Sequence, residues 1–136
     1  MAIRKADSNG REKKLQSQIK GLTLERKVSD WLHTRGWTDV RGRKTVRGHE
    51  IDLFATREDW LSGKEYCLVE CKACDVTHGH VTKFMTALND FYKGLPGNEL
   101  TGKPSVTAYI ATTGSVPRNA KGAAELSKIP IKFKQF

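Results

Sequence analysis

Apolar residues follow a helical period in some segments of the chain and form short runs typical of strands in others. Leu24, Val28 and Leu32 share one face of a predicted helix. This helix ends near Gly36, because glycine readily adopts the left-handed conformation that follows many helices. Residues 1–20 are polar and basic, and we interpret them as a flexible arm that becomes helical near its end.

Strand-like runs and helical stripes alternate through the rest of the chain. The predicted strands cover residues 37–40, 49–55, 65–73, 106–111 and 129–133, and the predicted helices cover residues 81–92 and 117–126. The basic segment RGRKTVRG, residues 41–48, is predicted to be the turn between the first two strands. The order is αβββαβαβ, which indicates an α/β fold with a mixed central sheet flanked by helices. We expect a basic N-terminal arm over residues 1–20 and a single domain over residues 21–136.

The net charge of +9 is concentrated in the first third of the chain. Residues 1–48 carry a net charge of +8, and residues 49–136 carry +1. Such a one-sided excess of cations favours a nucleic-acid partner, although a solvated charged surface is the alternative. The cations that we expect to contact DNA phosphates are Arg41, Arg43, Lys44 and Arg47 in the turn and Lys13 and Lys14 in the arm.

The three cysteines and the N-terminal sequence bear on the cellular compartment. No stretch approaches the roughly 18 apolar residues of a membrane helix, and the N-terminus lacks the apolar core of a secretory signal. An odd number of cysteines without such a signal favours reduced thiols over a disulfide framework. We therefore expect a cytoplasmic protein with no membrane partner.

Two charged residues interrupt the predicted strand that contains the sequence LVECKA. Because side chains alternate across a strand, Glu70 and Lys72 point to one face while Cys67 and Cys71 point to the other. A structural ion pair on a half-exposed strand explains this arrangement as well as a functional site does.

The strand HEIDLFA offers a second acidic face. The same alternation places Glu50 and Asp52 on one face and Ile51 and Leu53 on the other. If the two strands lie close in the sheet, Asp52 approaches Glu70 and the neighbouring lysine. Two carboxylates at such a position repel each other unless a cation lies between them, and a metal ion is the simplest candidate.

The donor atoms indicate which metal would bind. Carboxylate oxygens, a backbone carbonyl and water suit Mg²⁺ or Mn²⁺, whereas zinc prefers thiolates and imidazoles. A competing zinc site would use the C-x₂-C-x₃-H-x-H run formed by Cys71, Cys74, His78 and His80. We favour Mg²⁺ with no small-molecule cofactor, and we interpret the two histidines as surface residues at the mouth of the site, close to DNA.

A third acid is predicted on the first helix. On a helical wheel, Glu25 lies at the border of the apolar face, whereas Asp30 lies well outside it. We expect Glu25 to face inward, where a carboxylate usually has a lysine or a metal site as its partner. The alternative is an ordinary surface ion pair.

These residues resemble a known pattern. Glu25, then GHEID with Asp52, then VECK with Glu70 and Lys72, is similar to the PD-(D/E)xK nuclease superfamily, which has the restriction-endonuclease-like fold. The segments GLTLERKVSDWLHTRGW and YIATTGSVPRNAKGAAELSKIPI resemble the opening helix and the closing strand, turn and helix of the Mrr-like restriction endonuclease domain. The resemblance spans about residues 21–133.

The resemblance implies a Mg²⁺-dependent DNA endonuclease. The implied roles are metal ligands for Asp52, Glu70 and the backbone carbonyl of Cys71, the catalytic lysine for Lys72, and an outer or additional metal ligand for Glu25. Glu50, His78 and His80 are secondary candidates for the site. One departure is the absence of the proline that often precedes the family's aspartate, since Ile51 occupies that place.

The substrate and the oligomeric state stay open at this stage. Archaeal Holliday junction resolvases share this catalytic layout and a basic N-terminal segment, so the resemblance does not decide between duplex and branched DNA, and the sequence alone leaves RNA open as a substrate. Cutting two strands with one site per chain is simplest for a homodimer. The alternative class is a DNA-binding module without catalysis, which would be expected to have lost one of the acids or the lysine.

Overall fold

The computed structural model describes residues 2–61, 63–97 and 102–136, with residues 2–10 described by their backbone alone. The elements, in chain order, are α1 (Ala2–Thr34), β1 (Asp39–Val46), β2 (His49–Asp59), β3 (Gly63–Lys72), α2 (His78–Lys93), β4 (Ser105–Thr112), α3 (Arg118–Glu125) and β5 (Ile131–Gln135). The predicted αβββαβαβ order is therefore confirmed.

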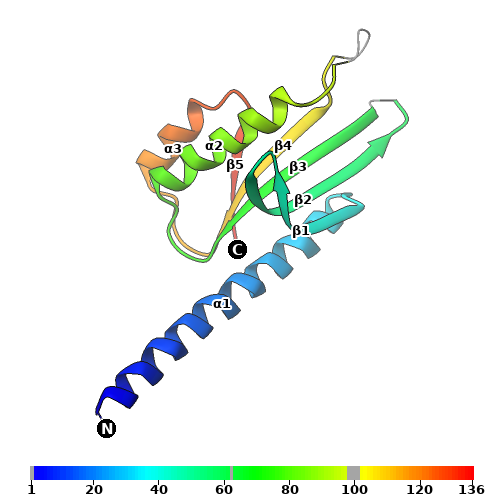
Figure 1. The fold of residues 1–136 in the computed structure, drawn as a ribbon. Coiled ribbons are helices and arrows are strands. Elements are labelled where there is room, and N and C mark those ends of the chain that lie inside the picture. Colours follow the sequence, from blue (N-terminus) through cyan, green and yellow to red (C-terminus); the bar gives the residue numbers. More distant parts are fainter. Residues whose placement is uncertain (1, 62, 98–101) are drawn as a thin grey trace.

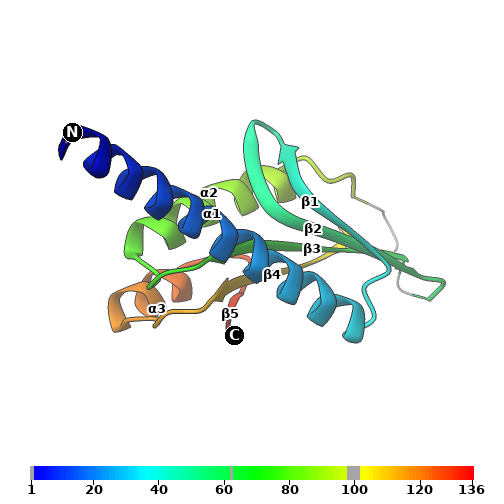
Figure 2. The ribbon, with the colours of Figure 1, turned by 90° about the horizontal axis from the view of Figure 1, so that it is seen from below.

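The five strands form one mixed sheet in the order β1-β2-β3-β4-β5 (Figure 1). The pairs β1–β2 and β2–β3 are antiparallel and are joined by short turns. The pairs β3–β4 and β4–β5 are parallel, so the chain must cross over between them, and α2 and α3 form these crossovers. Both crossover helices cover one face of the sheet, and α1 crosses the opposite face (Figures 1 and 2).

Each face of the sheet has its own apolar core. Leu68 of β3 and Ile51 of β2 pack with the buried residues of α2 and α3. Cys67 and Val69 of β3 instead pack with the buried residues of α1. Neighbouring β3 residues thus alternate between the two cores, as the sequence pattern predicts.

Helix α1 begins much earlier than predicted. It starts at Ala2, so the segment predicted as a flexible arm is the first part of this helix, which extends away from the sheet (Figure 1). All of residues 11–20 are exposed, including Leu15 and Ile19. This part consists largely of Lys, Arg, Glu, Gln and Leu, which have high helix propensity, and an apolar-stripe criterion misses such a helix. Over the described ranges, no helix is long and apolar enough to cross a membrane.

The basic segment 41–48 is mostly strand rather than turn. Strand β1 continues to Val46, and the turn consists of Arg47 and Gly48, whose φ angles are 49° and 81°. A left-handed φ at both positions is typical of a type I′ turn, whose twist matches that of the two strands it joins. Of the four cations predicted to lie in or beside this turn, only Arg47 is in it, and the others are on β1.

Candidate active site

The site is built where β2 separates from β3. The ladder between these strands reaches Leu53, which pairs with Val69, and does not continue at Asp52. The Asp52 carboxylate instead accepts a hydrogen bond from the backbone N–H of Cys71 at 2.8 Å. A side chain thus satisfies a backbone donor that the neighbouring strand no longer reaches.

The separation changes which residues of β2 face each core. Ile51 packs against α2, whereas Leu53 packs against α1, although simple alternation had placed them on the same face. The prediction was wrong because β2 does not keep a regular pleat through Asp52. On β1, Arg43 lies opposite Asp52, between the two pairs that flank this position in the register. Arg43 has a left-handed φ of 50°. Both strands of the hairpin are therefore irregular at this level.

Glu70 lies close to both Asp52 and Lys72. Its side chain is half-buried, and this burial is the main reason why its pKa is raised from 4.5 to about 7. The negative charge of Asp52 raises the pKa further, while Lys72, a hydrogen bond with the Asp52 backbone, and Lys83 lower it. The structure thus brings together the two carboxylates and the lysine that the sequence singles out.

Glu25 joins this cluster from α1. It is half-buried while Asp30 is exposed, as the helical wheel predicts. The pKa of Glu25 is raised by its burial and by the charges of Asp52 and Glu50, and it is lowered by Arg43. Asp52 therefore acts both on Glu25 from α1 and on Glu70 from β3.

An open cleft of about 550 Å³ gives access to part of the cluster. It lies between the β2–β3 pair and α2, and its polar lining residues are His49, Glu50, Glu70, Lys72, His80 and Lys83. Lys83 is a cleft residue that the sequence pattern did not predict. It follows His80 by three residues on a helix, so the helical period could have placed both on one face.

The carboxylates suit a divalent metal only if other donors help. Among the described residues, no group of three or more His, Cys, Asp or Glu side chains is arranged to hold a metal ion. Asp52 and Glu70 supply two carboxylates, and the charge of Asp52 is the second cause, after burial, of the raised pKa of Glu70. This donor set fits a hard ion such as Mg²⁺, which accepts a backbone carbonyl and keeps several waters.

The alternative zinc ligands do not form a site. Cys71 packs in the α1 core, and its pKa is raised mainly by burial, whereas Cys74 is exposed. His80 Nδ1 accepts a hydrogen bond from the Thr77 N–H at 3.1 Å and so belongs to the cap of α2. His78 is exposed. Cys67 and Cys71 both pack in the α1 core, on the face opposite Glu70, as side-chain alternation along β3 predicts.

Three of the predicted DNA-binding cations lie together. Arg41, Lys44 and Arg47 line a second open cleft, of about 490 Å³, beside the aromatic rings of Phe54 and Tyr66. The Lys44 ammonium lies 4.1 Å from the centre of the Phe54 ring. The other cations lie elsewhere: Arg43 acts on Glu25, and Lys13 and Lys14 are exposed on the extended part of α1.

Comparisons with known proteins add a limited structural likeness. No protein-family model matches the chain, and no curated protein matches it. A solved structure of a repair endonuclease from Pyrococcus abyssi is similar to it with a TM-score of 0.49 and 16% sequence identity. The match covers 71% of this chain and 36% of that one, so the chain spans about a third of the length of that protein. At this level of similarity, an activity must be argued from the residues of the chain itself.

Proposed function

We propose that the protein is a metal-dependent DNA endonuclease that hydrolyses phosphodiester bonds with Asp52, Glu70 and Lys72. The observation that supports this most strongly is the meeting of two carboxylates from adjacent strands beside a lysine, with the pKa of Glu70 raised to about 7. Such a concentration of like charge is costly, and it is common at sites that bind a cation or carry out catalysis.

The proposed metal is Mg²⁺ or Mn²⁺. Asp52, Glu70 and the backbone carbonyl of Cys71 would hold it, and Glu25 would be an outer or additional ligand. When bound, such an ion stabilises charge on the phosphate and lowers the pKa of a water. The Cys71 N–H orients the Asp52 carboxylate, which limits the rearrangement needed on binding.

Lys72 is the proposed partner of the reacting phosphate. It lies in the open cleft, where its charge acts on Glu70. An ammonium at this position can orient an attacking water or neutralise the negative charge that develops in the transition state. Glu50 and His80, which line the same cleft, are secondary candidates, and the exposed His78 is a candidate for contact with DNA near its mouth.

The cleft that contains Arg41, Lys44 and Arg47 is the proposed path of the DNA backbone. These cations lie on the same hairpin as Asp52, so phosphates held there would approach the acids. Contacts of this kind position DNA without reading its sequence. The Mrr-like type and a homodimer are part of this proposal and come from the sequence resemblance and from the need to cut two strands.

A cleavage assay tests the proposal. Wild-type protein and the variants Asp52→Asn and Lys72→Met would be incubated with plasmid, linear duplex, single strand and four-way junction, in Mg²⁺, Mn²⁺ or EDTA. We expect cleavage only with metal and a loss of roughly 100-fold or more in both variants. Lys128→Met, an exposed lysine outside the cleft, is the matched control and should cleave like the wild type. Equal cleavage by all four proteins would place the activity elsewhere.

The same assay separates the alternatives. Preference for the four-way junction would indicate a Holliday junction resolvase, and preference for duplex would indicate a restriction-like enzyme. A non-catalytic DNA-binding module is supported by one observation, the lack of a three-residue metal cluster among the described residues. DNA binding without cleavage on any substrate would favour that module.

A further inference from the structure

A third cleft lies on the face of the sheet that α1 crosses, away from the cleft of Glu70 and Lys72. Its volume is about 470 Å³. Its lining contains three cations, Arg35, Arg57 and Lys132, and three residues with hydroxyl groups, Thr34, Thr107 and Tyr109. No acidic side chain lines it in the described part of the chain.

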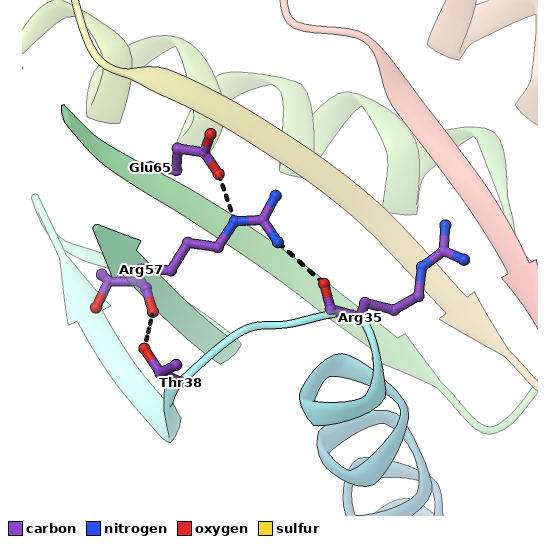
Figure 3. Close-up of polar contacts among 5 residues, drawn as sticks. Arg35, Thr38, Arg57 and Glu65 are labelled. Carbon is purple, nitrogen blue, oxygen red and sulfur yellow. Dashed lines mark hydrogen bonds and ion pairs between the residues drawn. The ribbon is translucent and has the colours of Figure 1, made fainter. Parts of the chain in front are cut away.

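Three contacts hold Arg57 at this cleft. Its Nη1 donates to the backbone carbonyl of Arg35 at 3.0 Å, and its Nε donates to Glu65 (Figure 3). The guanidinium also lies 4.1 Å from the centre of the Trp37 ring. These contacts use two of the five N–H donors of a guanidinium. Among the described residues it has no further hydrogen-bond partner, so its remaining donors are available to a ligand.

Arg35 is supported by aromatic rings. Its guanidinium lies 5.4 Å from the centre of the Trp31 ring, which makes an edge contact with Tyr109 of β4. Figure 3 shows the Arg35 and Arg57 side chains on the same side of the sheet. Cations that are already held in place lose less conformational entropy when they bind a ligand.

The charges of the cleft are poorly balanced. Glu65 offsets the charge of Arg57, but Arg35 and Lys132 form no ion pair within the described residues. Lys134, next along β5 on the same face, extends the positive surface, with its ammonium 5.7 Å from the centre of the Trp31 ring. Several cations with one acid among them favour an anionic ligand.

We propose that this cleft binds the phosphate backbone of a nucleic acid. Guanidinium groups match the geometry of a phosphate, and several cations on one face of the sheet suit a chain of phosphates better than a single one. Hydroxyl groups beside the cations add further donors to phosphate oxygens. This contact goes beyond the proposed cleavage site and does not require catalysis.

Lysine footprinting of the wild-type protein tests the contact without any substitution. The protein would be acetylated in EDTA with and without a short DNA duplex, and the modification of each lysine measured by mass spectrometry. We expect DNA to slow the acetylation of Lys132 at least 3-fold and to leave Lys121, exposed on α3, unchanged. If DNA changes the acetylation rates of Lys132 and Lys121 by the same factor, the proposal is wrong.

The footprint also distinguishes DNA binding at the third cleft from DNA binding at the proposed cleavage site. Protection of Lys44 without protection of Lys132 would overturn the third cleft as a DNA contact and leave the cleavage site standing. Protection of Lys132 without protection of Lys44 would support the third cleft alone. A parallel arm replaces DNA with inorganic phosphate. Protection of Lys132 by phosphate but not by DNA would overturn the nucleic-acid assignment in favour of a small-anion site.

Salt-dependent binding gives a second readout. The double variant Arg35→Gln/Lys132→Gln removes two exposed charges and keeps the Arg35 carbonyl that Arg57 uses. We expect its affinity for labelled duplex in EDTA to fall about 10-fold and the slope of log K against log salt to become shallower by about 1 to 2. Lys121→Gln/Lys128→Gln removes the same charge elsewhere, and an equal effect in this control would overturn the proposal.

Discussion

The Asp52 carboxylate accepts a hydrogen bond from the Cys71 backbone N–H at 2.8 Å, at the point where β2 leaves β3. A side chain from β2 therefore replaces a backbone carbonyl as the acceptor, and the two strands can diverge without leaving the Cys71 N–H unsatisfied. At this same point the charge of Asp52 acts on Glu70. The contact thus links the shape of the sheet to the chemistry of the site.

Removing the Asp52 carboxylate should affect stability as well as activity. Asp52→Ala leaves the half-buried Cys71 N–H without its partner, and we expect a loss of about 1–3 kcal/mol in the free energy of unfolding. Asp52→Asn keeps an oxygen that can accept the bond and should lose less. Urea denaturation measures both. An Asp52→Ala variant as stable as the wild type would show that the hydrogen bond does not stabilise the fold.

Glu70 should make stability depend on pH in metal-free protein. Its pKa rises from 4.5 to about 7 on folding, so between these values the folded protein holds a proton that the unfolded chain has released. The free energy of unfolding should therefore fall as the pH rises through this window, by up to about 3 kcal/mol. Glu70→Gln should remove this fall, and Glu125→Gln, at an exposed position of α3, should keep it. Urea denaturation in EDTA from pH 4 to pH 8 measures the effect.

The charge of Asp52 should be visible in the titration of Glu70. Since this charge raises the pKa of Glu70, Asp52→Asn should lower it, whereas Lys72→Met should raise it further. Carbon NMR of the Glu70 side-chain carboxyl group across this pH range would follow both changes. Equal titration in the wild type and in both variants would mean that these groups lie too far apart to interact.

The three thiols should differ in reactivity. Burial raises the pKa of Cys67 to about 12 and also raises the pKa of Cys71, while Cys74 is exposed. Because the thiolate is the reactive form, an aromatic disulfide reagent at pH 8 should modify Cys74 quickly and the other two slowly. Cys74→Ser should abolish the fast phase. If added zinc protects Cys74 at one equivalent, the ligands of the alternative zinc site can assemble after all.

Two glycines should respond oppositely to alanine. A Cβ on Gly114 would lie 2.5 Å from the backbone of Cys74 and Asp75, so Gly114→Ala must push two loops apart. We expect a loss of about 1–3 kcal/mol. Gly122, within α3, has open space around its Cβ position, and Gly122→Ala should gain about 0.5–1 kcal/mol from helix propensity. Thermal unfolding of both variants measures the difference.

The order of elements could be predicted because most helices and strands bury a regular apolar stripe. Glu25 could be placed facing the sheet for the same reason, since Leu24, Val28 and Leu32 define its helix face. The start of α1 could not be predicted from an apolar stripe, because the first part of this helix is exposed and depends on helix propensity rather than on packing. The alternation of side chains across a strand depends on local geometry alone, and the prediction made from it is confirmed along β3.

The candidate site was predicted less completely than the fold. Alternation failed in β2, where the Asp52 side chain replaces a backbone partner and Ile51 and Leu53 separate onto different faces. Lys83 was missed because an exposed lysine on a helix looks like ordinary surface until the helix is placed over Glu70. Such contacts depend on how elements pack, which residue periodicity does not encode.

The strand order of the sheet has a consequence for how the protein folds. Each strand pairs only with its neighbours along the chain, and β1, β2 and β3 are joined by short turns. Hairpins of this kind form within microseconds, so Asp52 and Glu70 can meet early, before the slower parallel pairing of β4 and β5. The third cleft needs Arg35, which directly follows α1, and Lys132 from β5, so it is complete only when the last strand has docked.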